Sequence, residues 1–557
     1  MKDNIDDPGN GEVLRIKIDG KKLLLIVAVA VVILGGVALR MHTLSDSRYP
    51  YILDGLLEGS YGGSIAETGM LAPEAGSSFD KTHTVSTPVF DVLIAAASLF
   101  QGEQTLFLLQ KLIAPFAAFL LIGVYVLAKK LTTNVRASLI ALMAVSAYGP
   151  FVIVTQAAWK ECVGICVLPF FFLSFMMRRD PKMRALSTLL LLMMPFVHHL
   201  VALIAVLAVA TFSAAGMVRA RRKRSVDRVA LTDVFVAVTA IVSMTAYYVL
   251  VSFDRLEYLT PENGLYLFLG VALLTSMGVY LMADRGMSKF GRVAMVTTMS
   301  AGLLLLLALN IVSPMGTVGT DALWALSLPT IAVVALAILG VFGISVWAST
   351  AGETKLIYLS MMSAPFVIVI YALLRANDLL SLTMITRTID LFDIGLMIAL
   401  GTFVAFVLKE RRPRTATAAV SAVCAVLLLT VPFALDSERY AGTRNDIFTY
   451  EVDAINWTVD MTPDGKIDTD EHFAYVGVLY NREMEQNLVK RFNGVFAFQS
   501  DMIMIASERW VTVGVKDLPY GWMQLNGTEF DLRISGLNLL YLGGPPGAQI
   551  MVLTVAP

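Results

Sequence analysis

Two carboxylates spaced four residues apart, Asp54 and Glu58, follow the first apolar segment of the chain. Tyr61 and Ile65 continue the helical spacing, which predicts a short helix with both carboxylates on one face, near a membrane surface. Such acids can deprotonate a hydroxyl or amide nucleophile, or hold a divalent cation through oxygen ligands. The alternative is a solvated loop helix that carries ordinary surface acids.

Charged residues at the starts of later apolar segments offer complementary chemistry. Lys160 and Glu161 open one segment, where Lys160 could bind substrate and Glu161 could position an acceptor or a cation. The alternative for Glu161 is a helix-start acid favoured by the helix dipole. Arg387 opens another segment, where its guanidinium could clamp a phosphate or serve as an interfacial anchor paired with Asp390.

Two adjacent histidines, His198 and His199, separate the expected fifth and sixth spans. Paired imidazoles in apolar surroundings need partners, and ionisable groups at membrane depth tend to be functional. They could bind a substrate phosphate or a metal, or cap the helix ends. Zinc is disfavoured, because the sequence offers no apparent third ligand.

A polar loop near the C-terminus partly matches a calcium-binding loop. Positions 1, 5, 6, 9 and 12 of an EF-hand are occupied by Asp460, Asp464, Gly465, Asp468 and Glu471. Thr462 and Pro463 depart from the pattern, and residues 472–480 are typical of a strand rather than an exit helix. We therefore expect a turn between a helix and a strand, with a calcium site as the alternative.

These residues are positioned by a chain that is 57% hydrophobic and 16% charged, with a mean hydropathy of +0.70, which excludes an ordinary soluble domain. About 20 apolar residues cross the hydrocarbon core, so about thirteen spans are expected. They lie near 23–39, 105–128, 136–155, 161–177, 184–196, 198–218, 230–252, 264–282, 293–312, 323–347, 356–374, 389–408 and 416–435. The shorter stretch 87–101 carries Asp91, and we expect an interfacial helix there.

The distribution of Lys and Arg predicts the orientation of the spans. Basic residues gather in cytoplasmic loops, and the chain is basic just before the first span, so residues 1–22 are expected inside. Counting spans then places every dense basic cluster inside, and places both the polar loop 40–104 and the C-terminal tail outside. No cleavable signal peptide is expected, because the first apolar run lacks a small-residue cleavage site.

The sequence thus predicts three parts of the chain. They are an N-terminal segment 1–22, a membrane bundle 23–435 that includes the outer loop 40–104, and a tail 436–557. The tail holds 17 acidic and 9 basic residues, and no basic stripe suggests nucleic acid. A helix near 446–460 and strands near 473–480, 510–515 and 547–555 predict a small α+β domain. The three cysteines lie in expected spans, so we expect no disulfide framework.

Two short motifs resemble the C-type glycosyltransferase (GT-C) superfamily of membrane enzymes. The first is Asp54, just after span one, followed by a short helix that ends in Ile65-Ala-Glu67-Thr-Gly69. The second is the Thr87-Pro88 pair that leads the next apolar helix. The superfamily includes oligosaccharyltransferases, protein mannosyltransferases and lipid A aminoarabinose transferases, and the architecture of the whole chain is similar to theirs.

The resemblance implies transfer of a sugar from a polyprenyl-phosphate donor to a glycan, lipid or protein acceptor at the outer membrane face. Asp54 would act as the general base, or organise the base and a Mg²⁺ or Mn²⁺ ion together with Glu161. Glu58 and Glu161 would help to position the acceptor or cation, and Arg387 would neutralise the leaving phosphate. The Trp-Trp-Asp-Tyr-Gly signature of oligosaccharyltransferase tails is absent, which favours a simpler monosaccharide transferase.

Other classes of protein are less consistent with the sequence. A flippase or transporter would carry charges at mid-bilayer and often an internal repeat, whereas the ionisable residues here gather at one face. A receptor or assembly factor would need fewer spans. Lipid-linked polysaccharide polymerases and ligases are close variants of the expected function, and the acidic tail with two Asn-x-Thr sequons would suit an archaeal cell surface.

Overall fold

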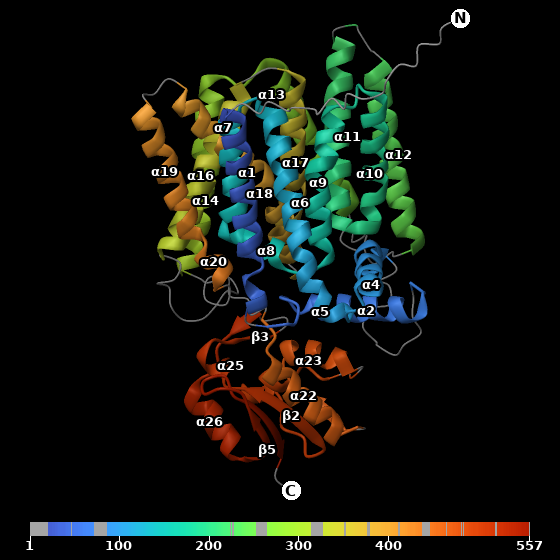
Figure 1. Ribbon diagram of the computed structural model, residues 1–557, viewed down its shortest axis with the longest axis vertical. Helices are drawn as coiled ribbons and strands as arrows, with labels where there is room; N and C mark the ends of the chain where they lie inside the picture. Colours follow the sequence, from blue (N-terminus) through green and yellow to red (C-terminus); the bar gives the residue numbers. More distant parts are fainter. Residues whose placement is uncertain are drawn as a thin grey trace, which may run out of the picture.

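The structure is a computed structural model that shows a helical bundle with a smaller mixed domain at one end (Figure 1). It describes residues 20–45, 47–71, 86–222, 224, 228–251, 264–312, 327–349, 352–375, 379–409, 413–436, 446–463, 465–480, 482, 484–517 and 521–555.

Each expected span corresponds to a helix or a bent helix pair of the bundle. The bundle helices are α1 (Gly20–Arg40), α6 (Ile113–Thr132), α7 (Val135–Ala147), α8 (Gly149–Gln156), α9 (Lys160–Met176), α10 (Pro181–Val197), α11 (His199–Arg222), α12 (Arg228–Val251), α13 (Gly264–Arg285), α14 (Lys289–Val312), α16 (Leu328–Ser349), α17 (Glu353–Leu374), α18 (Leu379–Leu408) and α19 (Pro413–Thr430). Among the described residues, nine helices are long and apolar enough to cross a membrane, and the α7–α8 pair, bent by 63°, is a further candidate. The chain is therefore a multi-pass membrane protein.

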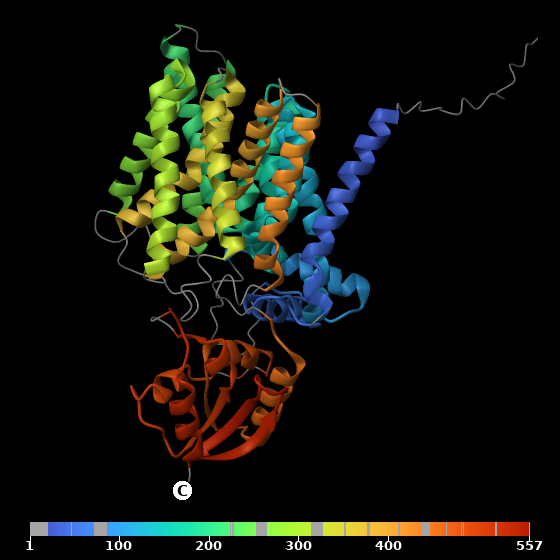
Figure 2. The same cartoon turned by 90° about the vertical axis from the view of Figure 1, so that its left-hand side faces the viewer.

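The expected outer loop forms short helices across the end of the bundle that faces the tail (Figure 2). They are η1 (His42–Ser45), α2 (Asp54–Thr68), α4 (Val89–Gln101), α5 (Thr105–Leu109) and η2 (Gln110–Leu112). Helix α2 begins at Asp54 and ends at Thr68. The next residue is Gly69, whose φ of 71° is left-handed and favours glycine. Helix α4 forms where the interfacial helix was expected.

The tail contains a four-stranded sheet with helices packed around it. Its elements, preceded by the short α20 (Pro432–Leu435), are α22 (Thr449–Met461), β1 (Lys466–Asp468), α23 (Glu471–Gly477), η4 (Val478–Tyr480), α24 (Leu488–Phe492), β2 (Met502–Ser507), α25 (Arg509–Thr512), β3 (Val515–Asp517), β4 (Gly521–Met523), α26 (Gly527–Ser535), β5 (Leu537–Gly543) and β6 (Ile550–Val555). The sheet order is β1-β2-β6-β5, with β1 and β2 parallel and the other pairs antiparallel. Strands β3 and β4 form a separate hairpin. The expected α+β domain is confirmed.

Two of the expected tail strands are wrong. Residues 473–480 form α23 and η4 instead of a strand, because the Asp470 carboxylate accepts a hydrogen bond from Phe473 N at 2.8 Å and caps a helix there. Residues 510–515 are mostly the short helix α25, and strand β3 begins only at Val515. The helix near 446–460 and the strand within 547–555 are confirmed as α22 and β6.

A buried apolar cluster joins the loop helices to the tail. Tyr49 and Leu56 pack with Ile447, Val452 and Phe473 of the tail. Helix α2 also contacts α23 and η4. These contacts hold the tail domain against the N-terminal end of α2, where Asp54 lies.

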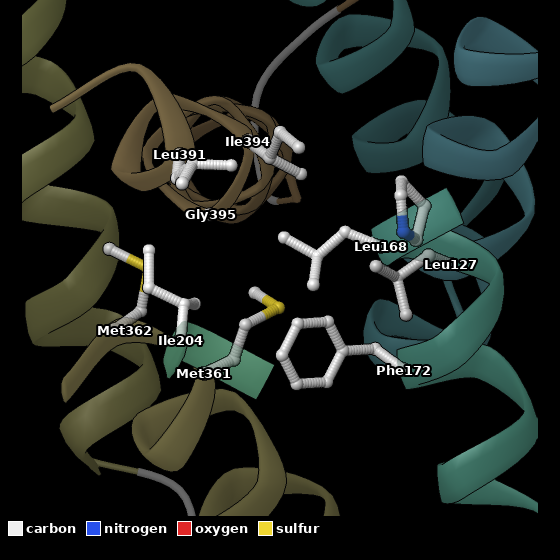
Figure 3. Close-up of a pocket in the computed structure, with 10 residues that line it drawn as sticks. Leu127, Leu168, Phe172, Ile204, Met361, Met362, Leu391, Ile394 and Gly395 are labelled. Atoms are coloured by element: carbon white, nitrogen blue, oxygen red, sulfur yellow. The ribbon is translucent and has the colours of Figure 1, made fainter. Parts of the chain in front are cut away.

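The centre of the bundle is densely packed. Figure 3 shows a small cavity among α6, α9, α11, α17 and α18, with Phe172, Met361 and Leu391 pointing toward it. Its volume of about 10 Å³ leaves room for roughly one water molecule. A void this small with apolar walls stays dry, so the bundle at this level is a packed core.

Glycines allow α18 to approach two neighbouring helices closely, and this predicts a stability effect. A Cβ at Gly343 of α16 would lie 2.0 Å from the Ala399 carbonyl oxygen, and one at Gly401 would lie 2.3 Å from the Ala137 carbonyl oxygen. Gly343→Ala and Gly401→Ala should each destabilise the protein by about 1–3 kcal/mol, because the backbones of the two contacting helices would have to move apart. Thermal unfolding in detergent measures this effect. Gly270→Ala is the control, because a Cβ there would meet no atom of the described residues within 4 Å. Equal midpoints for all three variants would contradict the prediction.

Candidate functional site

Asp54 and Arg387 approach each other at the end of the bundle that faces the tail. Asp54 is the first residue of α2, and Arg387 lies on α18. An Arg387 guanidinium nitrogen lies 3.8 Å from Asp54 Oδ2, and the side chains are 35% and 37% exposed, respectively. The guanidinium also lies over the ring of Trp159, 5.2 Å from its centroid. A carboxylate and a cation therefore stand side by side, and a substrate can reach both.

Glu161 adds a buried carboxylate to this pair. It lies in the first turn of α9, is 1% exposed, and is close enough for the charges of Arg387 and Asp54 to act on it. Neither of its carboxylate oxygens has a hydrogen-bond partner among the described residues. Leaving a buried carboxylate unsatisfied is costly, so these oxygens are suited to receive a cation or a substrate donor.

Asp390 extends the acidic cluster by one helical turn of α18. Its carboxylate interacts electrostatically with Glu161, Arg387 and Asp393. Sequence reasoning considered Asp390 only as an anchor partner of Arg387. Its spacing of three residues from Arg387 places both on the same helix face, which is the signal that could have added it to the site.

Glu58 and Lys160 form a separate buried cluster with Asp91. Lys160 Nζ lies 3.3 Å from Glu58 Oε2 and 2.9 Å from Asp91 Oδ2, and all three side chains are almost fully buried. Burial, together with the neighbouring Glu58 carboxylate, raises the pKa of Asp91 well above its ordinary value. The cluster ties α2, α4 and α9 together. The isolated acid in an otherwise apolar helix was the sequence signal for Asp91.

The tail places one more titratable side chain next to the site. Tyr475 lies on α23, which contacts α2. Burial raises the pKa of Tyr475, and the negative charges of Asp54 and Glu471 raise it further. Its phenol therefore stays protonated near neutral pH and can donate a hydrogen bond. Sequence reasoning missed Tyr475, because its segment was assigned to a strand.

The two histidines lie where the sequence placed them, at the break between α10 and α11. Helix α10 ends at Val197 and α11 begins at His199, so the expected boundary is confirmed. The two imidazole centroids are 4.7 Å apart, and His198 is buried. Helix α10 packs against α4 and α9, the helices that carry Asp91 and Lys160. A role in substrate binding stays a prediction.

In the candidate calcium loop, the carboxylate of Asp468 already binds a side chain of the tail. Asp468 Oδ2 accepts a hydrogen bond from Arg491 Nε at 2.6 Å inside the tail. Asp460 lies near the exposed end of α22 and Glu471 begins α23, while Asp464 lies outside the described residues. A calcium ion bound by Asp468 would have to displace the Arg491 guanidinium. Within the described ranges, no group of three or more His, Cys, Asp or Glu side chains could hold a metal ion.

The comparisons with known proteins show similarity at the level of structure. No family model and no curated protein matches the sequence. The apo oligosaccharyltransferase of Archaeoglobus fulgidus is similar over 94% of this chain and 80% of its own, with 13% identity and a TM-score of 0.57.

Two further structures of this archaeal enzyme are also similar. In complex with an inhibitory peptide and a dolichol-phosphate, it matches over 88% of this chain and 70% of its own, with 14% identity and a TM-score of 0.53. In complex with Zn and sulfate, it matches over 86% and 68%, with 14% identity and a TM-score of 0.54. The chain therefore has the fold of the archaeal oligosaccharyltransferase.

Proposed function

We propose that this protein transfers a sugar from a polyprenyl-phosphate-linked donor to an acceptor at the outer membrane face. The observation that carries the proposal is the accessible Asp54 carboxylate beside the Arg387 guanidinium, at the tail end of a GT-C fold. A base for the acceptor and a positive charge for the departing phosphate both promote sugar transfer. The similar archaeal enzyme has been solved with a dolichol-phosphate, which supports a lipid phosphate as the leaving group.

The reaction would proceed by direct displacement at the anomeric carbon. Asp54 takes the proton of the acceptor hydroxyl or amide, and the acceptor forms a new bond to the anomeric carbon. The bond from that carbon to the phosphate oxygen breaks, and Arg387 stabilises the negative charge that develops on the phosphate. Attack from the side opposite the phosphate inverts the anomeric configuration.

Asp54 and Glu161 are the residues that would hold a divalent cation. The unsatisfied oxygens of Glu161 next to Asp54 fit a hard cation such as Mg²⁺ or Mn²⁺. Mg²⁺ is usually bound through one or two carboxylates and completes its shell with water and substrate phosphate, so two protein ligands are sufficient. The cation would supply charge neutralisation at the donor phosphate.

In this proposal, Glu58 and Lys160 are positioning residues that hold the helix of Asp54 in place. Their burial in the cluster with Asp91 leaves little surface for a substrate, and the cluster fixes the helix that carries Asp54. His198 and His199 remain candidates for binding a substrate phosphate. The tail and the loop helices would face the exterior, as the positions of the basic residues predict.

Metal removal should abolish most of the transfer. Because the two buried oxygens of Glu161 have no hydrogen-bond partner in the part of the chain that the structure describes, we expect chelation to stop the reaction and Mg²⁺ or Mn²⁺ to restore it. Glu161→Gln should raise the metal concentration for half-maximal rate by at least about tenfold, because one charged ligand is lost. The rate is measured against free metal concentration for both proteins. Full activity in a chelator would contradict the cation's role and leave Asp54 as a base alone.

The activity itself is tested in reconstituted vesicles. Wild-type protein is given a panel of radiolabelled polyprenyl-phosphate sugars with glycan, lipid and peptide acceptors, and labelled product is measured. Transfer of single sugars is expected. Growth of long chains would instead identify a polysaccharide polymerase or ligase. Movement of labelled lipid across the bilayer without any product would overturn the proposal in favour of a flippase.

A further inference from the structure

A large pocket opens at the end of the bundle away from the tail. The residues of the proposed reaction lie at the opposite end. It lies between the α6–α7 turn and the adjoining ends of α16, α17 and α18, with a volume of about 730 Å³. Pockets of this size hold small ligands. Its basic lining differs in charge from the acidic cluster at the opposite end.

The described lining of this pocket is cationic. Arg136, Lys355 and Lys409 come from α7, α17 and the residue after α18, and the lining contains no acidic side chain. Arg136 and Lys409 are exposed, and neither takes part in an ion pair with another described residue. Lys355 is 1% exposed, and its Nζ donates a hydrogen bond to the Met282 carbonyl at 2.8 Å. Three cations therefore converge on one cavity from separate helices.

The remaining walls are apolar or already hydrogen-bonded. Leu131 and Val346 line the pocket, and Phe406 is a lining residue that is 61% exposed toward the surroundings of the bundle. Trp347 donates its indole N–H to Thr402 Oγ1 at 3.1 Å, so its ring acts as a wall. The pocket thus offers positive charge at its mouth and apolar surface beside it.

The N-terminus of α7 is not the anion-binding element of this pocket. Asn134 caps α7, and its Oδ1 accepts from Arg136 N at 2.9 Å and from Ala137 N at 3.3 Å. The first amides of α7 are therefore already satisfied. On the α7 side of the pocket, an anion would therefore be held by the Arg136 side chain rather than by the backbone.

From this arrangement we infer a binding site for a phosphate group carried by an anionic phospholipid. The cations neutralise the phosphate, and the exposed apolar surface around Phe406 accepts the start of an acyl chain. Ordinary interfacial anchoring would require only exposed basic side chains. The buried Lys355 and the volume of about 730 Å³ instead describe a site for a single lipid. Such a lipid would stabilise the packing of α7, α16, α17 and α18 at this end.

The test compares lipid affinities of the purified full chain in mild detergent, measured by native mass spectrometry. Wild type should bind one phosphatidylglycerol more tightly than phosphatidylcholine. The double variant Arg136→Gln/Lys409→Gln should bind phosphatidylglycerol about 25-fold more weakly, because each cation near an anionic lipid contributes about fivefold. Both replaced residues are exposed, so the fold should be retained.

The matched control is Lys129→Gln/Lys130→Gln, which removes two exposed cations of α6 that do not line the pocket. This control should keep its affinity within about twofold. An equal loss in the control would show general surface attraction and overturn the site. Equal affinity for the two lipids would overturn it as well. Displacement of phosphatidylglycerol by millimolar inorganic phosphate would overturn the lipid assignment in favour of a soluble phosphate.

Discussion

Asparagine in place of Asp54 is expected to reduce sugar transfer by about a hundredfold to ten-thousandfold. The amide keeps the shape of the carboxylate but cannot accept the acceptor's proton, and general base catalysis contributes about that factor. The substitution also removes the negative charge beside Arg387, which lies 3.8 Å away, and one ligand of the proposed cation. The loss should therefore appear mainly in kcat, while the protein remains folded because Asp54 is 37% exposed.

Glu67→Gln is the matched control for this prediction. Glu67 lies in the same helix, is exposed, and belongs to no contact of the site. Initial rates with a single labelled donor are compared at equal amounts of folded protein. A rate for Asp54→Asn within about threefold of wild type would place the base elsewhere, and Glu161 and Glu58 would then be tested in the same assay.

The membrane architecture could be predicted from the sequence because the bilayer imposes a simple length rule. Each apolar run of sufficient length became a helix, and even the break at His198 was visible as a polar interruption. The spacing of Asp54, Glu58 and Tyr61 predicted the short helix α2, and the family resemblance implied its end at a glycine. In the structure α2 ends at Thr68, because the following Gly69 accepts the left-handed conformation that ends a helix. Local rules thus place Asp54 at a helix boundary. They do not do so for Arg387, which lies inside α18 because that helix already begins at Leu379.

The pairing of distant residues could not be predicted in the same way. Glu58, Asp91 and Lys160 come from three helices, and sequence spacing carries no information on which acid meets which base. The approach of Arg387 to Asp54 likewise depends on how α18 packs against the loop helices. Tyr475 was missed for a different reason. Its β-prone segment becomes helical because the Asp470 cap and burial against the sheet outweigh intrinsic propensity.

A second large effect is expected on the stability of the protein when the buried cluster of Glu58, Asp91 and Lys160 is disrupted. Lys160→Met removes the cation that compensates two buried carboxylates and should destabilise the protein by about 3–5 kcal/mol, since an uncompensated buried charge remains. Thermal unfolding in detergent should show a clear fall in midpoint. Lys129→Met is the control, because that lysine is exposed on α6.

Unlike Lys160→Met, Asp91→Asn should make the protein less sensitive to a rise in pH. Comparing the two variants separates the effect of charge on stability from the effect of packing. The raised pKa of Asp91 means that the folded state binds its proton more tightly than the unfolded state. Its contribution to stability is therefore largest at low pH and falls as pH rises above the ordinary value of 3.8. Asparagine imitates the protonated carboxyl and keeps the Lys160–Glu58 pair, so the variant should lose less stability than wild type between pH 5 and pH 8. Equal thermal unfolding midpoints for Lys160→Met and wild type would contradict the prediction. They would show that the carboxyl groups of Glu58 and Asp91 are neutral without the lysine. In that case the cluster would not hold α2 in place through charge.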